Sequence, residues 1–249
     1  MYGWRARIGV IVSPPNTVVE GEFPRMAPDG VSVHVARLGR PQGTLQQLGG
    51  DVVLQTNQAL TRAAESLVEL KLDVVVFAHT SGSMLGGPAY ERELVSMLEN
   101  TVGCPAVTTA SAVVAALRAS GTARLALLAP YPDRMTVAER DLLEEVVTGL
   151  KIVSHRSLAM STGLSIGDLE PSVAYRESRK VDTPEADAVF LSGTNWRTID
   201  VIEELETDLK KPVFTANQVT PIASGWATLC KLGIAPKPGF GSVFSYLLP

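Results

Sequence analysis

The chain is short of the residues that mark secreted, membrane-spanning or nucleic-acid-binding proteins. It has two cysteines, Cys104 and Cys230, in 249 residues, too few for a disulfide framework. No apolar run approaches the ~20 residues of a membrane span, and the first, Ile8–Val12, is too brief for a signal peptide. The net charge of −4 leaves no basic excess for nucleic acid or an acidic membrane. We therefore expect a soluble, cytoplasmic protein whose partner is a small molecule.

Motifs for cofactors and metals are missing as well. No Gly-x-Gly-x-x-Gly follows the first apolar run, and no P-loop occurs. The three histidines, His34, His79 and His155, do not group with other ligand residues at metal-binding spacing. Both cysteines are expected to be inert buried thiols. The sequence therefore predicts an activity that needs no cofactor.

Short β-branched segments alternate with longer helical segments along most of the chain. Several of the short segments are apolar without alternation, as in strands covered by helices on both faces. This order predicts an α/β fold with a parallel sheet and right-handed crossovers. The expected strands are Arg7–Ser13, Val31–Leu38, Asp73–His79, Pro105–Thr109, Arg124–Pro130, Ile152–Ser157, Ala188–Ser192 and Pro212–Ala216. The expected helices are Gln55–Leu70, Pro88–Asn100, Ser111–Ser120, Arg134–Gly149, Thr198–Leu209 and Gln218–Lys231.

Three further segments lack a clear period. Pro14–Asp29 is rich in proline and Gly39–Gly50 in glycine and glutamine, so both are expected to be irregular. Gly163–Pro184 is expected to be a loop or partly helical. Long loops in a compact domain often serve as lids, although mobility alone would also explain them.

Two segments of the chain are weakly similar to each other. Val75-Val76-Phe77-Ala78-His79-Thr80-Ser81 is similar to Val189-Phe190-Leu191-Ser192-Gly193-Thr194-Asn195. The order of strands and helices is also similar in residues 1–115 and 120–215. These similarities predict two duplicated lobes with a cleft between them.

The residues that follow the expected strands are the first place to look for a site. In open parallel sheets, ligands bind outside the carboxyl ends of the strands. Hydroxyls, amides and glycines gather there and could cradle a carboxylate through side chains and free backbone N–H groups. They occur at Ser13–Thr17, His79–Ser83, Pro130–Asp133, Gly193–Arg197, and Asn217 with Gln218.

Five stretches, taken in order, resemble a known family. They are residues 7–17 (RIGVIVSPPNT), 31–38 (VSVHVARL), 78–83 (AHTSGS), 130–133 (PYPD) and 191–198 (LSGTNWRT). The chain is similar to maleate cis–trans isomerases, to arylmalonate decarboxylases and, more widely, to the Asp/Glu racemase superfamily. The resemblance implies two pseudo-symmetric Rossmann-like lobes with parallel four-stranded sheets and an active-site cleft between them. We expect residues 1–115 with 216–249 to form the first lobe and residues 116–215 the second.

The resemblance also implies a catalytic layout, from which this chain departs. Members of the superfamily place a cysteine at the end of equivalent strands in each lobe, and the decarboxylases keep only the second-lobe one. Those positions match His79 and Gly193, and neither is a cysteine. Asn16 and Tyr131 match family residues, whereas a further asparagine expected before Ile166 is absent.

These departures narrow the chemistry. Racemisation with two bases needs a proton donor on each face, and Gly193 has no side chain to supply one unless another loop does. Thioether-type isomerisation needs a thiolate, which neither position offers. His79 suits general acid–base work near neutral pH. We therefore expect one-sided chemistry such as decarboxylation, elimination or hydration, or hydrolysis.

The resulting hypothesis is an isomerase- or lyase-type enzyme that acts on a small carboxylate or dicarboxylate. His79 and Tyr131 are the candidate catalytic residues. The candidate substrate-binding residues are Asn16, Thr80, Ser81, Ser83, Gly193, Thr194 and Asn195.

Other interpretations remain open from the residues alone. His79 could simply be a packed residue at a strand end, and Asn16, Asn217 or Thr194 could cap helices or turns. A hydrolase of a small amide, imide or lactone is one alternative function, and a non-catalytic carboxylate binder is another. A homodimer or homotetramer is the expected assembly.

Overall fold

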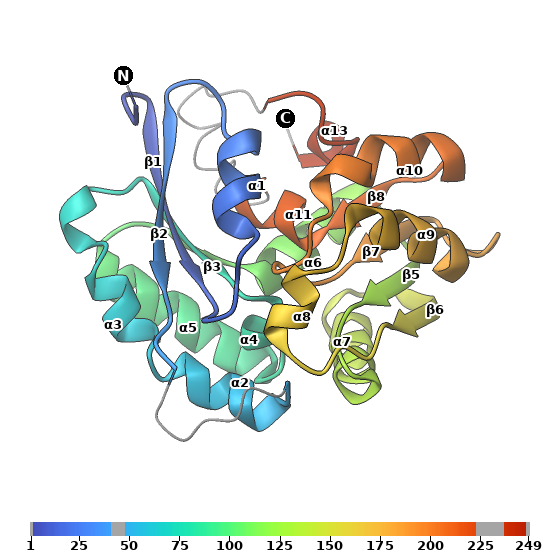
Figure 1. Cartoon of the computed structure of the whole chain (residues 1–249), viewed down its shortest axis with the longest axis horizontal. Helices are drawn as coiled ribbons and strands as arrows, with labels where there is room; N and C mark the ends of the chain where they lie inside the picture. Colours follow the sequence, from blue (N-terminus) through green and yellow to red (C-terminus); the bar gives the residue numbers. More distant parts are fainter. Residues whose placement is uncertain (1, 41–47, 223–236, 248–249) are drawn as a thin grey trace.

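Two parallel four-stranded sheets form the framework of the chain. The computed structural model describes residues 2–40, 48–222 and 237–247. Figure 1 shows the first sheet on the left and the second on the right, with α8 (Gly163–Gly167) between them. The first sheet has the order β2-β1-β3-β4, from β1 (Ala6–Val12), β2 (Val31–Arg37), β3 (Val74–Ala78) and β4 (Ala106–Thr108). The second has the order β6-β5-β7-β8, from β5 (Arg124–Ala129), β6 (Lys151–Ser157), β7 (Ala188–Leu191) and β8 (Val213–Thr215).

All eight expected strands are confirmed, with ends that differ by at most one residue. β3 and β7 are buried along their whole length, because helices cover both faces and the continuous apolar runs exclude water there. The edge strands β2 and β6 are only partly buried and carry more polar residues. β3 and β7 hold the same place in the order of their sheets, which explains why the sequences around residues 75–81 and 189–195 are similar.

Helices were less well predicted around the first sheet. The single helix expected over residues 55–70 is wrong: α2 (Gly50–Asn57), α3 (Leu60–Glu65) and a short 3₁₀ helix (Val68–Leu70) take its place. The break follows Asn57, whose side-chain amide donates to the Gly82 carbonyl at 2.7 Å and to the Tyr90 hydroxyl at 3.1 Å. These contacts tie the end of α2 to the helices behind it.

The segment Pro14–Asp29, expected to be irregular, contains α1 (Val19–Met26). Its first turn is capped by Asn16, whose Oδ1 accepts from the amides of Val18 and Val19 at 3.0 Å each. Pro24 lies inside the helix, so the proline content of this segment wrongly predicted an irregular structure. The segment 163–184 is partly helical, as one of the two expectations had it.

The remaining helices surround the sheets and connect their strands. The expected helix 218–231 is described only as far as Ile222, and Cys230 and residues 41–47 of the expected loop lie outside the described residues. Among the helices in the described ranges, none combines the length and apolar composition that crossing a membrane requires. The other helices are α4 (Thr80–Met84), α5 (Gly87–Val102), α6 (Thr109–Ser120), α7 (Asp133–Val146), α9 (Pro171–Val181), the 3₁₀ helix Ile199–Val201, α10 (Ile202–Leu209), α11 (Ala216–Ile222) and α13 (Val243–Leu247).

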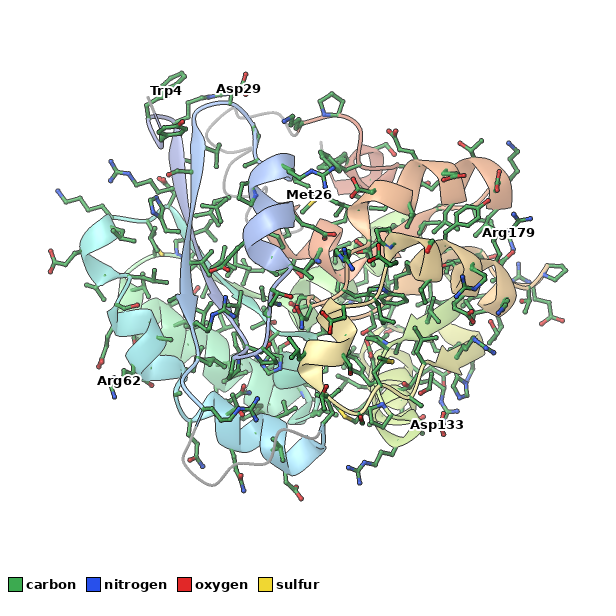
Figure 2. All side chains as sticks on the ribbon, in the orientation of Figure 1. Trp4, Met26, Asp29, Arg62, Asp133 and Arg179 are labelled. Carbon is green, nitrogen blue, oxygen red and sulfur yellow. The ribbon has the colours of Figure 1, made fainter. Side chains whose placement is uncertain are left out.

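One hydrophobic core joins the two sheets. A single buried cluster includes side chains of β1, β3, β5 and β7, and Met26 of α1 packs into it. A second, smaller cluster fills the other face of the first sheet, around Phe77 and Leu98. Charged side chains such as Arg62 and Arg179 point outward at opposite edges of the molecule (Figure 2).

Polar contacts also fasten α1 to the second sheet's helices. The buried carboxylate of Glu22 accepts from the Thr198 amide at 2.8 Å and from the Asn217 side chain at 2.6 Å. Arg25 forms an ion pair with Asp200 at the surface nearby. Burial raises the pKa of Glu22 from 4.5 to about 7, against the lowering effect of these hydrogen bonds.

The titration of Glu22 should make the fold less stable as the pH rises. The folded carboxyl keeps its proton where the unfolded one has lost it, so this stabilisation is complete below pH 4.5 and is lost by about pH 7. A shift of this size is worth about 3 kcal/mol. We expect Glu22→Gln to gain up to that amount relative to the natural protein between pH 5 and 8, measured by chemical denaturation.

Glu203→Gln is the matched control, because Glu203 lies exposed in the first turn of α10. It should leave the pH dependence unchanged. A stability difference between Glu22→Gln and the natural protein that stays constant with pH would show that Glu22 does not titrate in this window.

Candidate active site

A pocket of about 60 Å³, partly open to solvent, lies between the two sheets. Its walls come from the carboxyl ends of β1, β3, β5 and β7 and from α2 and α8. This is where parallel sheets place ligands. The lining residues are Ser13, Pro14, Pro15, Arg40, Leu48, Val52, Val53, Thr56, His79, Ser81, Tyr131, Gly163, Ile166, Gly193, Thr194 and Asn195.

His79 follows β3 directly and occupies the cap position of α4. Its ring packs edge-to-face on Phe77, with 5.6 Å between centroids, and Nε2 lies 3.4 Å from the Ser81 hydroxyl oxygen. Nδ1 is buried and has no hydrogen-bond partner in the described part of the chain. It faces Gly82, where a β-carbon would overlap the imidazole. The ring is therefore held in a slot that depends on glycine at position 82.

Burial lowers the pKa of His79 from 6.5 to about 4. The imidazole is therefore neutral at pH 7 in the free protein and can accept a proton. An anionic ligand beside it would favour the charged form and raise its pKa.

Gly193 occupies the position after β7 that corresponds to His79 after β3. Its φ of +102° is a conformation that residues with a side chain rarely adopt. A β-carbon there would lie 3.0 Å from Cγ of Pro130 and 3.3 Å from the Tyr131 hydroxyl oxygen. Both positions that the family resemblance assigns to cysteines therefore open on the same pocket.

Tyr131 reaches the pocket from the end of β5 and is almost fully buried. Burial, with the charge of Glu139 as a smaller cause, raises the pKa of the phenol. The hydroxyls of Ser192 and Thr80 lie close enough to act in the opposite direction. The phenol therefore stays protonated and can donate to a ligand.

Two of the expected binding residues instead fasten the pocket walls with their side chains. Asn195 donates to the Pro15 and Gly163 carbonyls at 3.1 and 2.6 Å, and its Oδ1 accepts from the Thr17 amide at 2.8 Å. Thr194 donates to the Ala78 carbonyl at 2.9 Å. Both residues line the pocket, but these side-chain groups join β1, β3 and α8 to the loop after β7.

The other expected binding residues divide between the pocket and its surroundings. Ser81 lines the pocket, and Thr80 lies beside Tyr131. Asn16 is buried behind the lining, with Nδ2 unpartnered in the described ranges. The hydroxyl of Ser83 donates to the carbonyls of His79 and Thr80 and accepts from the Ala110 amide, and this side chain lines a neighbouring cavity instead.

The remaining polar candidates lie away from the pocket. Asn217 binds Glu22 and the Trp196 carbonyl. His34 pairs with Ser32 on β2, and His155 is exposed on β6. No group of three or more His, Cys, Asp or Glu side chains within residues 2–40, 48–222 and 237–247 is arranged to hold a metal ion.

Sequence reasoning missed Glu139, a buried carboxyl on α7 beside the pocket. Ser192 donates to its two oxygens at 2.7 and 2.8 Å. Burial raises the pKa of Glu139 from 4.5 to about 7. The signal was present: Glu139 shares the buried face of α7 with Met135, Thr136 and Leu143.

The chain is similar in sequence to known proteins over most of its length. A family model described as arylmalonate decarboxylase matches residues 8–244. The chain belongs to this family. An arylmalonate decarboxylase from Bordetella bronchiseptica is 28% identical and covers 95% of each chain, and a maleate isomerase from Pseudomonas putida is 27% identical over 96% of this chain and 97% of its own. The relatives are thus isomerases and decarboxylases of the Asp/Glu racemase superfamily.

Solved structures share the fold. The maleate isomerase Iso from Pseudomonas putida S16, as a cysteine-to-alanine variant with maleate, superposes with a TM-score of 0.86 at 24% identity, over 97% of this chain and 98% of its own. An arylmalonate decarboxylase structure gives 0.76 at 25% identity, over 96% and 99%. The expected two-sheet α/β architecture is therefore confirmed.

Within this family framework, the pocket has two kinds of wall. Arg40 is the one formally charged side chain among the lining residues that the structure describes. Leu48, Val52, Val53 and Ile166 make an apolar wall. The apolar wall provides a place where a charged group would lose its water.

The packing of His79 against Gly82 can be tested by adding one methyl group at position 82. In Gly82→Ala, the new β-carbon should displace the imidazole, and this overpacking should destabilise the protein by about 1–3 kcal/mol. Gly21→Ala is the matched control, because Gly21 is also helical and its β-carbon would meet open space. It should stabilise by about 0.5–1 kcal/mol through helix propensity. Equal stabilisation by both substitutions, measured by urea denaturation, would contradict this placement of His79.

Proposed function

We propose that this family member catalyses a cofactor-independent decarboxylation or isomerisation of a small carboxylate, with His79 as its acid–base residue. The observation that carries the proposal is a buried neutral imidazole in a pocket whose described lining residues include the cation Arg40 and no carboxylate. The decarboxylase and isomerase relatives support the reaction class. Arylmalonate and maleate, the compounds in their names, are the first substrates to try.

Decarboxylation fits the pocket best. The apolar wall around Val52 and Ile166 would receive the carboxylate that leaves, where loss of water destabilises the charged group. The bond to this carboxylate breaks, carbon dioxide departs, and the electron pair remains on the substrate as an enediolate. Neutral donors such as Tyr131 and Ser81 would stabilise the enediolate oxygens. A single proton then goes back to carbon.

His79 would supply or accept that proton on one side of the pocket. In the free protein its pKa is about 4, so it carries no proton at pH 7. A dianionic substrate would raise this pKa, and the ring would take up a proton as the substrate binds. Tyr131 is the second candidate catalytic residue, because its protonated phenol also faces the pocket.

The roles of the neighbouring residues follow from their positions. We assign substrate contact to Ser81, to the backbone of Gly193 and to Thr194, while Thr80 orients Tyr131. Asn16 and Asn195 hold the walls in place. The cytoplasmic location and the homodimer or homotetramer expected from the sequence stay predictions.

His79→Gln should separate catalysis from binding. The glutamine is neutral and of similar size, but it cannot exchange a proton, so kcat should fall by about 10²–10⁴. Phenylmalonate and maleate, together with a panel of small mono- and dicarboxylates, serve as probes for thermal stabilisation and for product formation. Stabilisation by bound probe should survive the substitution.

Several outcomes would change the proposal. Full turnover by His79→Gln would remove His79 from the reaction. Incorporation of labelled water oxygen into the product would indicate a hydrolase. Thermal stabilisation by a probe without turnover in the natural protein would indicate a carboxylate binder.

Arg40 should favour doubly charged ligands. Arg40→Gln is expected to raise KM for a dicarboxylate by about fivefold, the value of roughly 1 kcal/mol for an exposed charge contact, and Arg40→Lys should recover part of it. Arg62→Gln makes the same charge change on α3, away from the pocket lining, and should leave KM unchanged (Figure 2). An equal rise in KM for Arg40→Gln and Arg62→Gln would show that only net charge matters.

A further inference from the structure

The Gly193 side of the pocket contains a proton donor although Gly193 has no side chain. The Tyr131 hydroxyl oxygen would lie 3.3 Å from a β-carbon at Gly193, so the phenol lies directly beside the position that a side chain there would occupy. Tyr131 therefore reaches the side of the pocket that the loss of cysteine leaves without an acid. It comes from the end of β5, a different loop from that of Gly193.

A chain of buried polar groups continues behind Tyr131. The Ser192 hydroxyl lies close enough to the phenol to influence its pKa, and it also donates to both oxygens of Glu139. Ser192 is fully buried, and Glu139 is 3% exposed. The order is therefore Glu139, Ser192, Tyr131 and then the pocket.

We propose that Glu139, Ser192 and Tyr131 form a hydrogen-bonded relay that holds a proton for the Gly193 side of the pocket. Tyr131 would be the catalytic residue, since it touches the substrate, and Glu139 and Ser192 would be positioning residues that act through it. The inference rests on the proposed function for the identity of the proton acceptor, but the relay itself belongs to the free protein.

The surroundings of Glu139 favour a protonated carboxyl. α4 packs against α7 and has no charged residue, and the charged residues of β6, Lys151 and Arg156, are exposed. Among the described residues, Tyr131, the neutral His79 and Arg40 are the titratable or charged groups that line the adjoining pocket. No ion pair joins Glu139 to a cation in the described part of the chain, so the carboxyl keeps its proton more easily, which agrees with its pKa of about 7.

Each proton given up along the relay of Tyr131, Ser192 and Glu139 is replaced by the next group. For an enediolate carbon that presents its face to the Gly193 side, Tyr131 rather than His79 gives the single proton, and a C–H bond forms there. Ser192 then gives its proton to the phenolate oxygen, and Glu139 gives its proton to the Ser192 oxygen. Glu139 ends as a carboxylate that accepts from Ser192, within the 2.7 and 2.8 Å that separate their oxygens. Water restores the proton before the next turnover.

Infrared spectroscopy of the free protein tests the relay without a substrate. In a Glu22→Gln background, which removes the other buried carboxyl whose pKa is about 7, a band from a protonated carboxylic acid should be present at pH 6 and absent once Glu139→Gln is added. Interrupting the relay by Ser192→Ala or Tyr131→Phe should shift that band, because the hydrogen bonding of the Glu139 carboxyl changes. Glu145→Gln, an exposed change on the same helix, should leave the band in place. A Glu139 that is already a carboxylate at pH 6, or a band unmoved by Ser192→Ala and Tyr131→Phe, would overturn the relay.

Turnover of phenylmalonate provides the second arm. Glu139→Gln keeps an oxygen that accepts from Ser192 but carries no proton, so kcat should fall about tenfold or more with KM nearly unchanged. The pH profile of kcat should lose its limb near pH 7, and Glu139→Asp should restore part of both. A purely structural Glu139 would leave the profile's shape intact.

The two arms separate this inference from the proposed function. The predicted infrared result without turnover of any probe would support the relay and count against decarboxylation or isomerisation. Turnover that depends on His79, with an unperturbed pH profile in Glu139→Gln, would support the proposed function and reject the relay.

Discussion

The His79 imidazole lies in a slot bounded by Phe77 and Gly82, and most of the site's chemistry depends on that packing. Water is excluded from Nδ1, so the charged ring is disfavoured and the neutral base persists at physiological pH. The same exclusion makes the pKa responsive, because a single anion in the pocket would offset much of the burial cost. An exposed histidine at the same strand end would be half-protonated near pH 6.5 whether or not a ligand was bound.

The walls around this slot are fixed by hydrogen bonds between segments far apart in sequence. Asn195 binds the loop after β1 and the start of α8, and Thr194 binds the end of β3. Glu22 and Asn217 make a similar connection on the other side of the core. Such contacts hold donors and acceptors in place before a ligand arrives, which lowers the reorganisation needed in a reaction. The asparagines and threonines of the strand-end loops therefore act largely as supports.

The strands could be predicted because a strand that is buried on both faces needs a continuous run of apolar residues. Runs such as Val74–Ala78 and Ala188–Leu191 are apolar without alternation, and the position after each strand follows directly from the topology. Helix limits were harder: the break after Asn57 depends on contacts with Gly82 and Tyr90, and α1 contains Pro24. The first effect is not local in sequence, and in the second a helix contains a residue that usually ends one.

The site was foreseen where residues follow strands and missed where helices complete it. His79, Tyr131 and Gly193 meet in one pocket, as the strand order implies. Arg40, the apolar wall and Glu139 come from other segments, and only their three-dimensional placement gives them a role. Gly193 was expected to leave one face without an acid unless another loop supplied it, and Tyr131 reaches that face from the loop after β5.

The central claim is that burial keeps His79 neutral until an anion enters the pocket. The most direct measurement is a nitrogen-15 NMR titration of the three histidines, with the His79 signal assigned by its absence from His79→Gln. The account predicts a pKa near 4 in the free protein and a higher value with bound phenylmalonate or maleate. A free-state pKa at or above 6.5, unchanged by either probe, would contradict it.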